Sequence, residues 1–204
     1  MKVINLLIVL FCLCACNTNK GKNKFTDNIV NSISLKSHAI IYLQPYEDFS
    51  QKDAEKLSAE VLKNLNGVFP GLWTIKILPS KSLPKEAYYN PRKRYLADVL
   101  LRDLPELHNS YYVIGLTHKD ISYKIHNCTN YGIMGLTPLG KRKSIVSDFR
   151  AKGNNFIAVI IHEFGHGFYS LRHCYNTKCI MCDYQEHKGK PFTYKLCKDH
   201  SFTH

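Results

Sequence analysis

Two histidines four residues apart stand in the last quarter of the 204-residue chain, with a glutamate directly after the first. They are His162 and His166, and the glutamate is Glu163. If residues 155–168 form a helix, both imidazoles project from one face, about one turn apart, so both can bind one metal ion. Glu163 is too close in sequence to be a third ligand, but it is well placed to accept a proton from a metal-bound water. The spacing therefore predicts a zinc site with the hydrolytic chemistry of a zinc peptidase.

The sequence around this motif favours a catalytic site over an ordinary core helix. The motif alone also occurs by chance on helices. Here the preceding run, residues 156–161, is apolar almost all round, as expected for a helix buried in a domain core. His173 and several closely spaced cysteines follow, and a core helix has no need of them. This context indicates a metal site built onto a buried helix.

The pattern as a whole resembles the archaemetzincins, a metzincin-type family of zinc metallopeptidases. The residues that carry the resemblance are His162, Glu163, His166, His173 with the adjoining Cys174, Cys179 and Met181. The resemblance covers roughly residues 38–200. It implies an α/β (mixed α+β) fold with a mixed twisted sheet, a backing helix, an active-site helix and a small Cys-rich, zinc-bound C-terminal part.

The same resemblance implies how the site would work. His162, His166 and His173 would bind a catalytic zinc, and Glu163 would be the general base that passes a proton from water to the leaving amine. Met181 would form an apolar floor beneath the histidines, a role that overlaps with ordinary core packing. A strand at 131–136 or at 144–148 would either pair with an extended peptide substrate or only support the sheet.

The chain departs from the family pattern in two places. His173 follows His166 by seven residues, where the family has six, and Tyr169-Ser170 replace one glycine that lets the chain leave the helix at positive φ. The second departure is His200, which stands where the family has the last cysteine of a Cys-x-x-Cys pair. Structural zinc accepts three cysteines and a histidine as readily as four cysteines.

A second zinc site is predicted from the sulfur residues. Cys174, Cys179, Cys197 and His200 have zinc-like spacing, and a tetrahedral structural site would tie the C-terminal tail to the active-site segment. Two zinc ions per chain are therefore expected, one catalytic and one structural. Disulfides are the alternative in a secreted compartment, and Cys182 is a possible substitute ligand. Cys128 is expected to be a lone buried thiol.

The N-terminal segment predicts targeting rather than folded structure. Lys2 precedes an apolar run to Leu13 that is too short to span a membrane but fits the core of a signal peptide. Its end, Leu13-Cys14-Ala15-Cys16, resembles a bacterial lipoprotein signal, so residues 1–15 would be removed and Cys16 acylated. A plain secretory peptide or an uncleaved anchor is the alternative.

The remaining chain divides into a tether and one domain. Polar, lysine-rich residues predict a flexible tether over 16–35, and the archaemetzincin-like domain would occupy 36–204. The expected location is the cell envelope, as a membrane-anchored lipoprotein on the periplasmic side or the cell surface. The formal net charge of +12 fits an anionic membrane surface.

Local patterns predict the elements of the domain. The expected strands are 38–45, 72–78, 110–116, 132–136 and 144–147. Helices are expected from Ser50 to about Gly67 and from Asn90-Pro91 to about Pro105, in addition to the active-site helix.

Two functions follow from these observations. One is a zinc metallopeptidase, monomeric, with a peptide or protein substrate and with the membrane as its second partner. The alternative is a catalytically inactive, zinc-folded binding lipoprotein that lost catalysis through the altered spacing before His173. Retention of Glu163 favours the enzyme, because a binding protein has no need of a general base. No nucleic-acid recognition motif is present.

Overall fold

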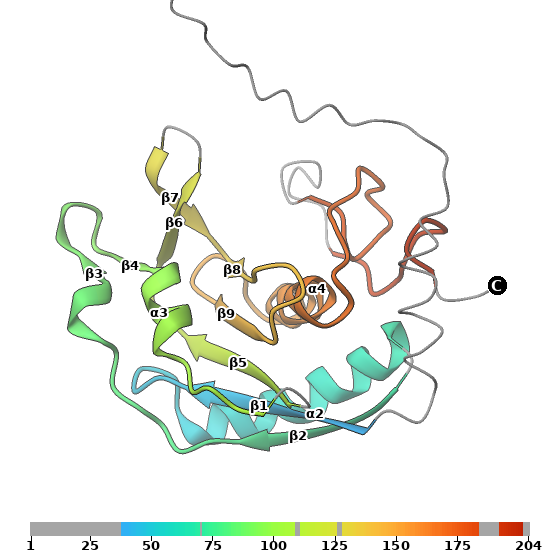
Figure 1. Cartoon of the computed structure of the whole chain (residues 1–204), viewed down its shortest axis with the longest axis horizontal. Coiled ribbons are helices and arrows are strands. Elements are labelled where there is room, and N and C mark those ends of the chain that lie inside the picture. Colours follow the sequence, from blue (N-terminus) through green and yellow to red (C-terminus); the bar gives the residue numbers. More distant parts are fainter. Residues whose placement is uncertain (1–37, 70, 109–110, 126–127, 184–191, 202–204) are drawn as a thin grey trace, which may run out of the picture. The chain divides into compact units, whose positions relative to one another are not determined.

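Five strands form the main sheet, in the order β2-β1-β5-β9-β8 (Figure 1). Their bounds are β1 His38–Pro45, β2 Leu72–Ile77, β5 Tyr111–Thr117, β8 Gly135–Leu136 and β9 Lys143–Ser147. The first four strands of this order run parallel to one another, whereas β8 is antiparallel to β9. The sheet is therefore mixed, with its antiparallel strand at one edge.

The computed structural model describes residues 38–69, 71–108, 111–125, 128–183 and 192–201. These residues belong to one unit, Ile33–His204. The signal peptide and the tether expected from the sequence both lie outside the described residues. Among the helices of the described part, none has both the length and the apolar character needed to cross a membrane.

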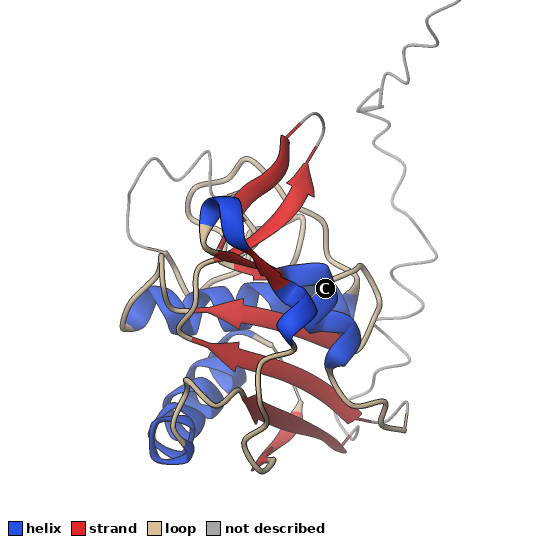
Figure 2. Ribbon diagram, turned by 90° about the vertical axis from the view of Figure 1, so that its left-hand side faces the viewer, coloured by secondary structure: helices blue, strands red, loops and turns tan. Residues whose placement is uncertain are grey.

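Helices cover both faces of the main sheet (Figure 2). Helices α2 (Gln51–Val68) and α4 (Asn154–Tyr169) share one hydrophobic cluster with Ile41 and Ile114 of the sheet. The short helix α3 (Ala97–Asp103) packs through Leu100 in a second cluster, which contains Val113 and Ile145. Neighbouring residues of β5 thus face opposite sides, as a pleated strand requires. The result is a three-layer core with α4 buried in one outer layer.

A second, four-stranded sheet stands beside the first, in the order β3-β4-β6-β7. Its strands are β3 Tyr88–Tyr89, β4 Arg94–Leu96, β6 Ile121–Ile125 and β7 Cys128–Ile133. Two 3-10 turns, η1 Lys85–Ala87 and η2 Asn90–Arg92, flank β3. The antiparallel β6–β7 hairpin projects away from the main sheet in both views (Figures 1 and 2).

The predicted fold class is confirmed, as are most of the predicted elements. Strands β1, β2, β5 and β9 and helices α2 and α4 lie where the sequence places them, within about two residues at their ends. Ser50 caps α2, and its Oγ accepts the N–H of Asp53 at 3.0 Å. The backing helix and the active-site helix of the predicted architecture are therefore both present.

Two element predictions are wrong. The helix expected from Asn90 is a single 3-10 turn that ends at Lys93, where φ is 51°. Tyr95 then pairs with Ile121 in the second sheet, so the helix proper begins only at Ala97. The strand expected at 132–136 is split between β7 and β8, which belong to different sheets. The strand β6 was not predicted at all.

Candidate active site and metal centres

Helix α4 carries two imidazoles that meet a third from the following loop. The Nε2 atoms of His162 and His166 are 2.9 Å apart. Nε2 of His173 lies 3.1 Å from that of His162 and 3.0 Å from that of His166. The structure thus brings all three predicted ligands together, and their ring nitrogens point at one position.

The partners of the other ring nitrogens show that this cluster fits a cation. Nδ1 of His162 lies 2.8 Å from the carbonyl oxygen of Ile180, and Nδ1 of His166 lies 2.6 Å from that of Leu171. A carbonyl oxygen only accepts, so each Nδ1 carries the proton and each Nε2 presents a lone pair. Two lone pairs cannot hydrogen-bond to each other, whereas a metal ion binds both.

The third histidine has a carboxylate as its outer partner. Oδ2 of Asp183 lies 3.4 Å from Nδ1 of His173, which favours the tautomer with Nε2 free to bind a metal. Burial lowers the pKa of His166 to about 4, so this imidazole is neutral at pH 7, as a ligand must be. The chemistry of the donor set matches a three-histidine zinc site with one open position.

The inserted residue before His173 is absorbed at the end of the helix. Helix α4 continues through Tyr169, whose ring stacks on Phe69 with centroids 4.8 Å apart. Ser170 then takes the left-handed conformation, φ 55° and ψ 27°, that the family pattern assigns to glycine. The N–H of Leu171 donates to the carbonyl of Gly165 at 3.1 Å and closes the turn. His173 therefore still reaches the other two imidazoles.

Glu163 is buried beside the histidines, with only 7% of its surface exposed. Its carboxylate lies against strand β8, where a Cβ on Gly135 would come within 2.5 Å of Oε1. Burial raises the pKa of Glu163 to about 7, and a hydrogen bond from Thr137 opposes part of that shift. A carboxylate with this pKa can both take and release a proton near neutral pH.

Three hydroxyl groups hold α4 against the sheet, and none of them was predicted from the sequence. The Tyr112 hydroxyl donates to the carbonyl of Glu163 at 3.1 Å and lies 2.6 Å from Oγ of Ser144. The hydroxyl oxygen of Thr137 lies 2.6 Å from the same Oγ. The sequence offered one indication of this network: Ser144 is a polar residue next to the β-branched residues of β9. The groups to which it hydrogen-bonds could not be predicted, because Tyr112 is far away in sequence.

Met181 packs against helix α4. Its side chain is fully buried, and its sulfur lies against α4, where a Cβ on Gly165 would come within 2.6 Å of Sδ. Gly165 stands between the two helix histidines in the sequence. Met181 therefore packs against the helix that carries two of the histidines.

Two of the three imidazoles, those of His162 and His173, open into a cleft of about 580 Å³. His162, Glu163 and His173 line it together with the β6–β7 hairpin and strand β8. Of the two strands considered for substrate pairing, β9 lies between β5 and β8 and so has no free edge. In the described part of the chain β8 pairs with β9 alone, so its other edge is open.

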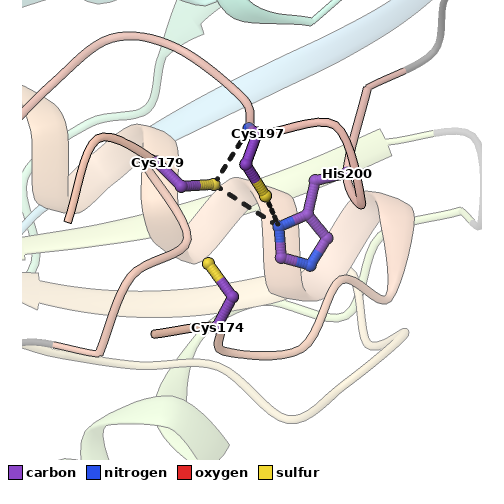
Figure 3. Close-up of side chains that lie close together, drawn as sticks. All are labelled: Cys174, Cys179, Cys197 and His200. Carbon is purple, nitrogen blue, oxygen red and sulfur yellow. Dashed lines mark hydrogen bonds between the residues drawn. The ribbon is translucent and has the colours of Figure 1, made fainter. Parts of the chain in front are cut away.

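The second candidate centre is formed by three cysteines and a histidine (Figure 3). Nδ1 of His200 lies 3.4 Å from Sγ of Cys179 and 3.5 Å from Sγ of Cys197. The ligand atoms of these residues and of Cys174 all lie within 4.8 Å of one another. The three cysteines form no disulfide, so the geometry favours the metal over the disulfide alternative.

Burial of this second cluster explains why a cation fits it. Burial raises the pKa of the Cys179 thiol to about 12 and also raises that of Cys174. Burial lowers the pKa of His200, which keeps this imidazole neutral. Buried thiolates require a compensating positive charge, and a divalent metal supplies it.

Two other cysteine predictions have clear outcomes. Cys182 lines the cleft and approaches the carbonyl of Asp183 at 3.5 Å, and it is not part of the four-residue cluster. The prediction that Cys128 is buried is wrong, because this residue is exposed at the first position of β7.

The two centres share one backbone segment. The N–H of Cys174 donates to the carbonyl of Met181 at 3.0 Å, and the N–H of Asp183 donates to the carbonyl of Cys174 at 3.1 Å. The N–H of Ile180 donates to the carbonyl of Lys195 in the tail at 2.6 Å. Residues 173–183 therefore belong to both sites, and the C-terminal tail is paired with them.

Fold and site together define a class: a mixed α/β domain of archaemetzincin-like architecture, with a three-histidine site on its buried helix and a second Cys/His site behind it. The arrangement is consistent with a zinc peptidase.

Two solved structures show this likeness directly. The crystal structure of archaemetzincin from Archaeoglobus fulgidus, in complex with malonate, is similar with a TM-score of 0.60 and 25% identity, over 79% of this chain and 97% of that chain. Archaemetzincin from Methanopyrus kandleri has a TM-score of 0.65 and 21% identity, over 81% of this chain and 92% of that chain, and shows the fold alone. No family model matches the chain, and no curated protein matches it.

Proposed function

We propose that this chain is a zinc-dependent metallopeptidase that hydrolyses peptide bonds. One observation carries the proposal: three imidazole Nε2 atoms lie within 3.1 Å of one another, and two of these rings, His162 and His173, line a cleft with the buried residue Glu163. The archaemetzincin-like fold supports it. The second centre, of Cys174, Cys179, Cys197 and His200, would hold a structural zinc.

The chemistry divides between the metal and Glu163. His162, His166 and His173 would hold the catalytic zinc, which when bound lowers the pKa of a water in its open position and polarises a peptide carbonyl. Glu163 would accept a proton from the attacking water and later deliver it to the leaving amine. Its pKa of about 7 suits both transfers, and a nearby cation would move this pKa down.

The surrounding residues keep Glu163 in place for this role. Gly135 leaves room for the carboxylate, and Thr137 hydrogen-bonds to it. Tyr112 holds the backbone carbonyl of the same residue. The side chain is thus directed into the cleft by one strand and its backbone is fixed by another.

The test is cleavage of a mixed peptide library by the wild-type chain and by Glu163→Gln. Removal of a general base is expected to reduce kcat by about 10²- to 10⁴-fold, with zinc content unchanged. Glu55→Gln is the matched control, because Glu55 is exposed on α2 and far along the chain from the site. Cleavage that persists unchanged in Glu163→Gln would contradict the mechanism. A zinc-loaded wild-type chain that cleaves no peptide would favour the inactive binding protein.

We also propose that Cys16 anchors the chain to a membrane of the cell envelope. Support comes from the sequence alone: Lys2, the apolar run to Leu13, and the segment Leu13-Cys14-Ala15-Cys16. Labelled fatty acid supplied to expressing cells is expected to appear in the wild-type protein and not in Cys16→Ala. Equal labelling of both would contradict the anchor.

A further inference from the structure

One face of the β6–β7 hairpin presents aromatic and apolar side chains to the catalytic cleft. Tyr123 of β6 lies directly opposite Tyr131 of β7. Ile125 and Ile133 follow two residues later on each strand, and all four side chains line the cleft that contains Glu163. Period-two spacing places Tyr131 and Ile133 on one face with Tyr123, whereas a register shift between Tyr123 and Ile125 interrupts the alternation on β6. The hairpin is therefore a wall of the cleft.

The opposite face of the hairpin is occupied by buried polar residues. Ser122 and Asn130 are buried, and Nδ2 of Asn130 donates to Oγ of Ser122 at 2.9 Å. The guanidinium of Arg94 donates to the carbonyl of Asn130 at 2.8 Å. This face fixes the hairpin to the rest of the second sheet, which leaves the tyrosine face directed toward the cleft.

The two tyrosines remain partly open to solvent. Tyr123 is 37% exposed and Tyr131 is 42% exposed, although both are large aromatic residues. An exposed apolar surface beside a concave site commonly marks a binding surface. Arg150, which also lines the cleft, is held by two hydrogen bonds of 2.8 Å to Asp120, so its charge is compensated.

We infer that Tyr123 and Tyr131 form a specificity subsite that holds a large apolar or aromatic side chain of the peptide substrate. The inference rests on the proposed function, and it names the substrate class of the same cleft. Tyrosine rings offer flat apolar faces that favour offset or edge-on contact with another ring and gain little from a small polar side chain. A peptide held in the cleft beside Glu163 places a neighbouring side chain against this wall.

The first experiment measures the preference of the enzyme. A set of peptides carries a single phenylalanine at each position in turn in an alanine-glycine background, and each has a partner with serine instead. We expect Tyr131→Ser and Tyr123→Ser each to lower the phenylalanine-to-serine ratio of kcat/KM by about tenfold for the position that meets the wall. Tyr88→Ser is the control, because Tyr88 is 43% exposed on β3 of the same sheet but lies outside the cleft lining.

The second experiment measures binding without catalysis. The full chain carrying Glu163→Gln is titrated with the same peptides labelled with fluorescein, and anisotropy gives the dissociation constants. Tighter binding of the phenylalanine peptide, lost in Glu163→Gln combined with Tyr131→Ser, supports the subsite even if the wild-type chain cleaves nothing, in which case the proposed function alone fails. Cleavage by the wild-type chain with an unchanged preference in both tyrosine variants overturns the subsite and leaves the proposed function standing.

Discussion

The two candidate metal centres are built from different kinds of structure. Two of the three histidines stand on α4, a helix whose residues are nearly all buried in the core. The ligands of the Cys/His centre lie outside every helix and named strand, in the segment after α4 and in the tail. Core packing can therefore hold most of the first centre without metal, whereas the second depends on its metal to fix the chain.

The centres also differ in how far their ligands are exposed to solvent, and the difference is largest at His173. The side chain of His173 is 49% exposed and faces the cleft. Cys179 is fully buried and Cys197 is 9% exposed. An accessible site with three ligands suits catalysis, and a closed site with four suits structure. Because His173 and Cys174 are adjacent, the closed site holds the backbone that carries the last ligand of the open one.

The largest effect is expected from Cys179→Ser. Loss of this buried ligand removes the structural metal, whose binding in small zinc domains is worth roughly 10–16 kcal/mol. The segment with His173 then loses its support, so zinc per chain should fall from about two to near zero, as measured by elemental analysis. His162→Ala should remove only about one zinc, because the Cys/His centre does not depend on α4 for its ligands.

Cys128→Ser is the matched control for the loss of a thiol. Cys128→Ser removes an exposed thiol and should leave both metals bound. If Cys179→Ser retained one zinc and His162→Ala lost both, the dependence between the centres would run in the opposite direction.

The second-largest effect is expected from acidification, which should weaken zinc binding more at the Cys/His centre than at the histidine site. Metal binding must displace protons from three cysteines, and burial has raised the pKa of Cys179 to about 12. While all three thiols are protonated, each lowering of the pH by one unit should therefore reduce zinc affinity at this centre by up to about 10³-fold, because three protons must leave. At the histidine site, the pKa of His166 is lowered to about 4, so above that pH this ligand has no proton to displace, and fewer protons should be released there than by the three cysteines.

Calorimetry in buffers of different ionisation enthalpy measures this difference. Protons released per zinc are compared between the wild-type chain and His162→Ala, in which only the Cys/His centre binds. Equal proton release at the two centres would show that the thiols are already ionised before metal binds.

Gly165→Ala tests the contact between the helix and the segment that the centres share. The added Cβ would lie 2.6 Å from Sδ of Met181, which is fully buried and cannot move freely. We expect a loss of about 1–3 kcal/mol in the free energy of unfolding, measured with urea at saturating zinc. Gly67→Ala on α2 is the control, since nothing lies within 4 Å, and it should stabilise by about 0.5–1 kcal/mol. Equal effects of the two changes would contradict the packing of Met181 against α4.

Patterns that are local in sequence predicted most of these structures. The apolar run before His162 predicted α4, and the cysteine spacing predicted a cluster with His200. Neither required knowledge of the fold, because the periodicity of a helix and the spacing of metal ligands are properties of short segments. The convergence of His173 with the helix histidines was also expected, but the means by which the longer loop achieves it was not.

Features that depend on distant pairing were missed. Strand β4 pairs with β6, and the paired residues Tyr95 and Ile121 are far apart in sequence, so the segment around Tyr95 was predicted to be helical. Strand β6 was also missed, although its other partner, β7, follows it directly and its residues alternate between apolar and polar. The contact of Glu163 with Gly135 likewise joins residues that no local pattern connects. Cys128 was expected to be buried because cysteine usually is, whereas it begins a hairpin strand whose first residues are exposed. Side-chain type alone does not determine burial at the end of a projecting element.

The smallest effect is expected from Ser170→Gly, and it bears on how the centres support each other. Ser170 has φ 55°, a conformation that costs a side-chain-bearing residue about 1–2 kcal/mol. Glycine removes that strain but gains freedom in the unfolded chain, so the free energy of unfolding should rise by only about 0.5 kcal/mol. Ser58→Gly, within the regular part of α2, should instead lower it by a similar amount.

Zinc binding by Ser170→Gly distinguishes two ways of holding His173. The backbone of Cys174 is paired with Met181 and Asp183, and this pairing lies beyond the turn at Ser170. If the pairing positions His173, then loosening the turn leaves zinc affinity at the histidine site unchanged, as competition with a chelator would show. A clear fall in that affinity, with the Cys/His centre still loaded, would mean that the left-handed turn itself positions the third ligand. The inserted residue would then be part of the site rather than a tolerated extension of the helix.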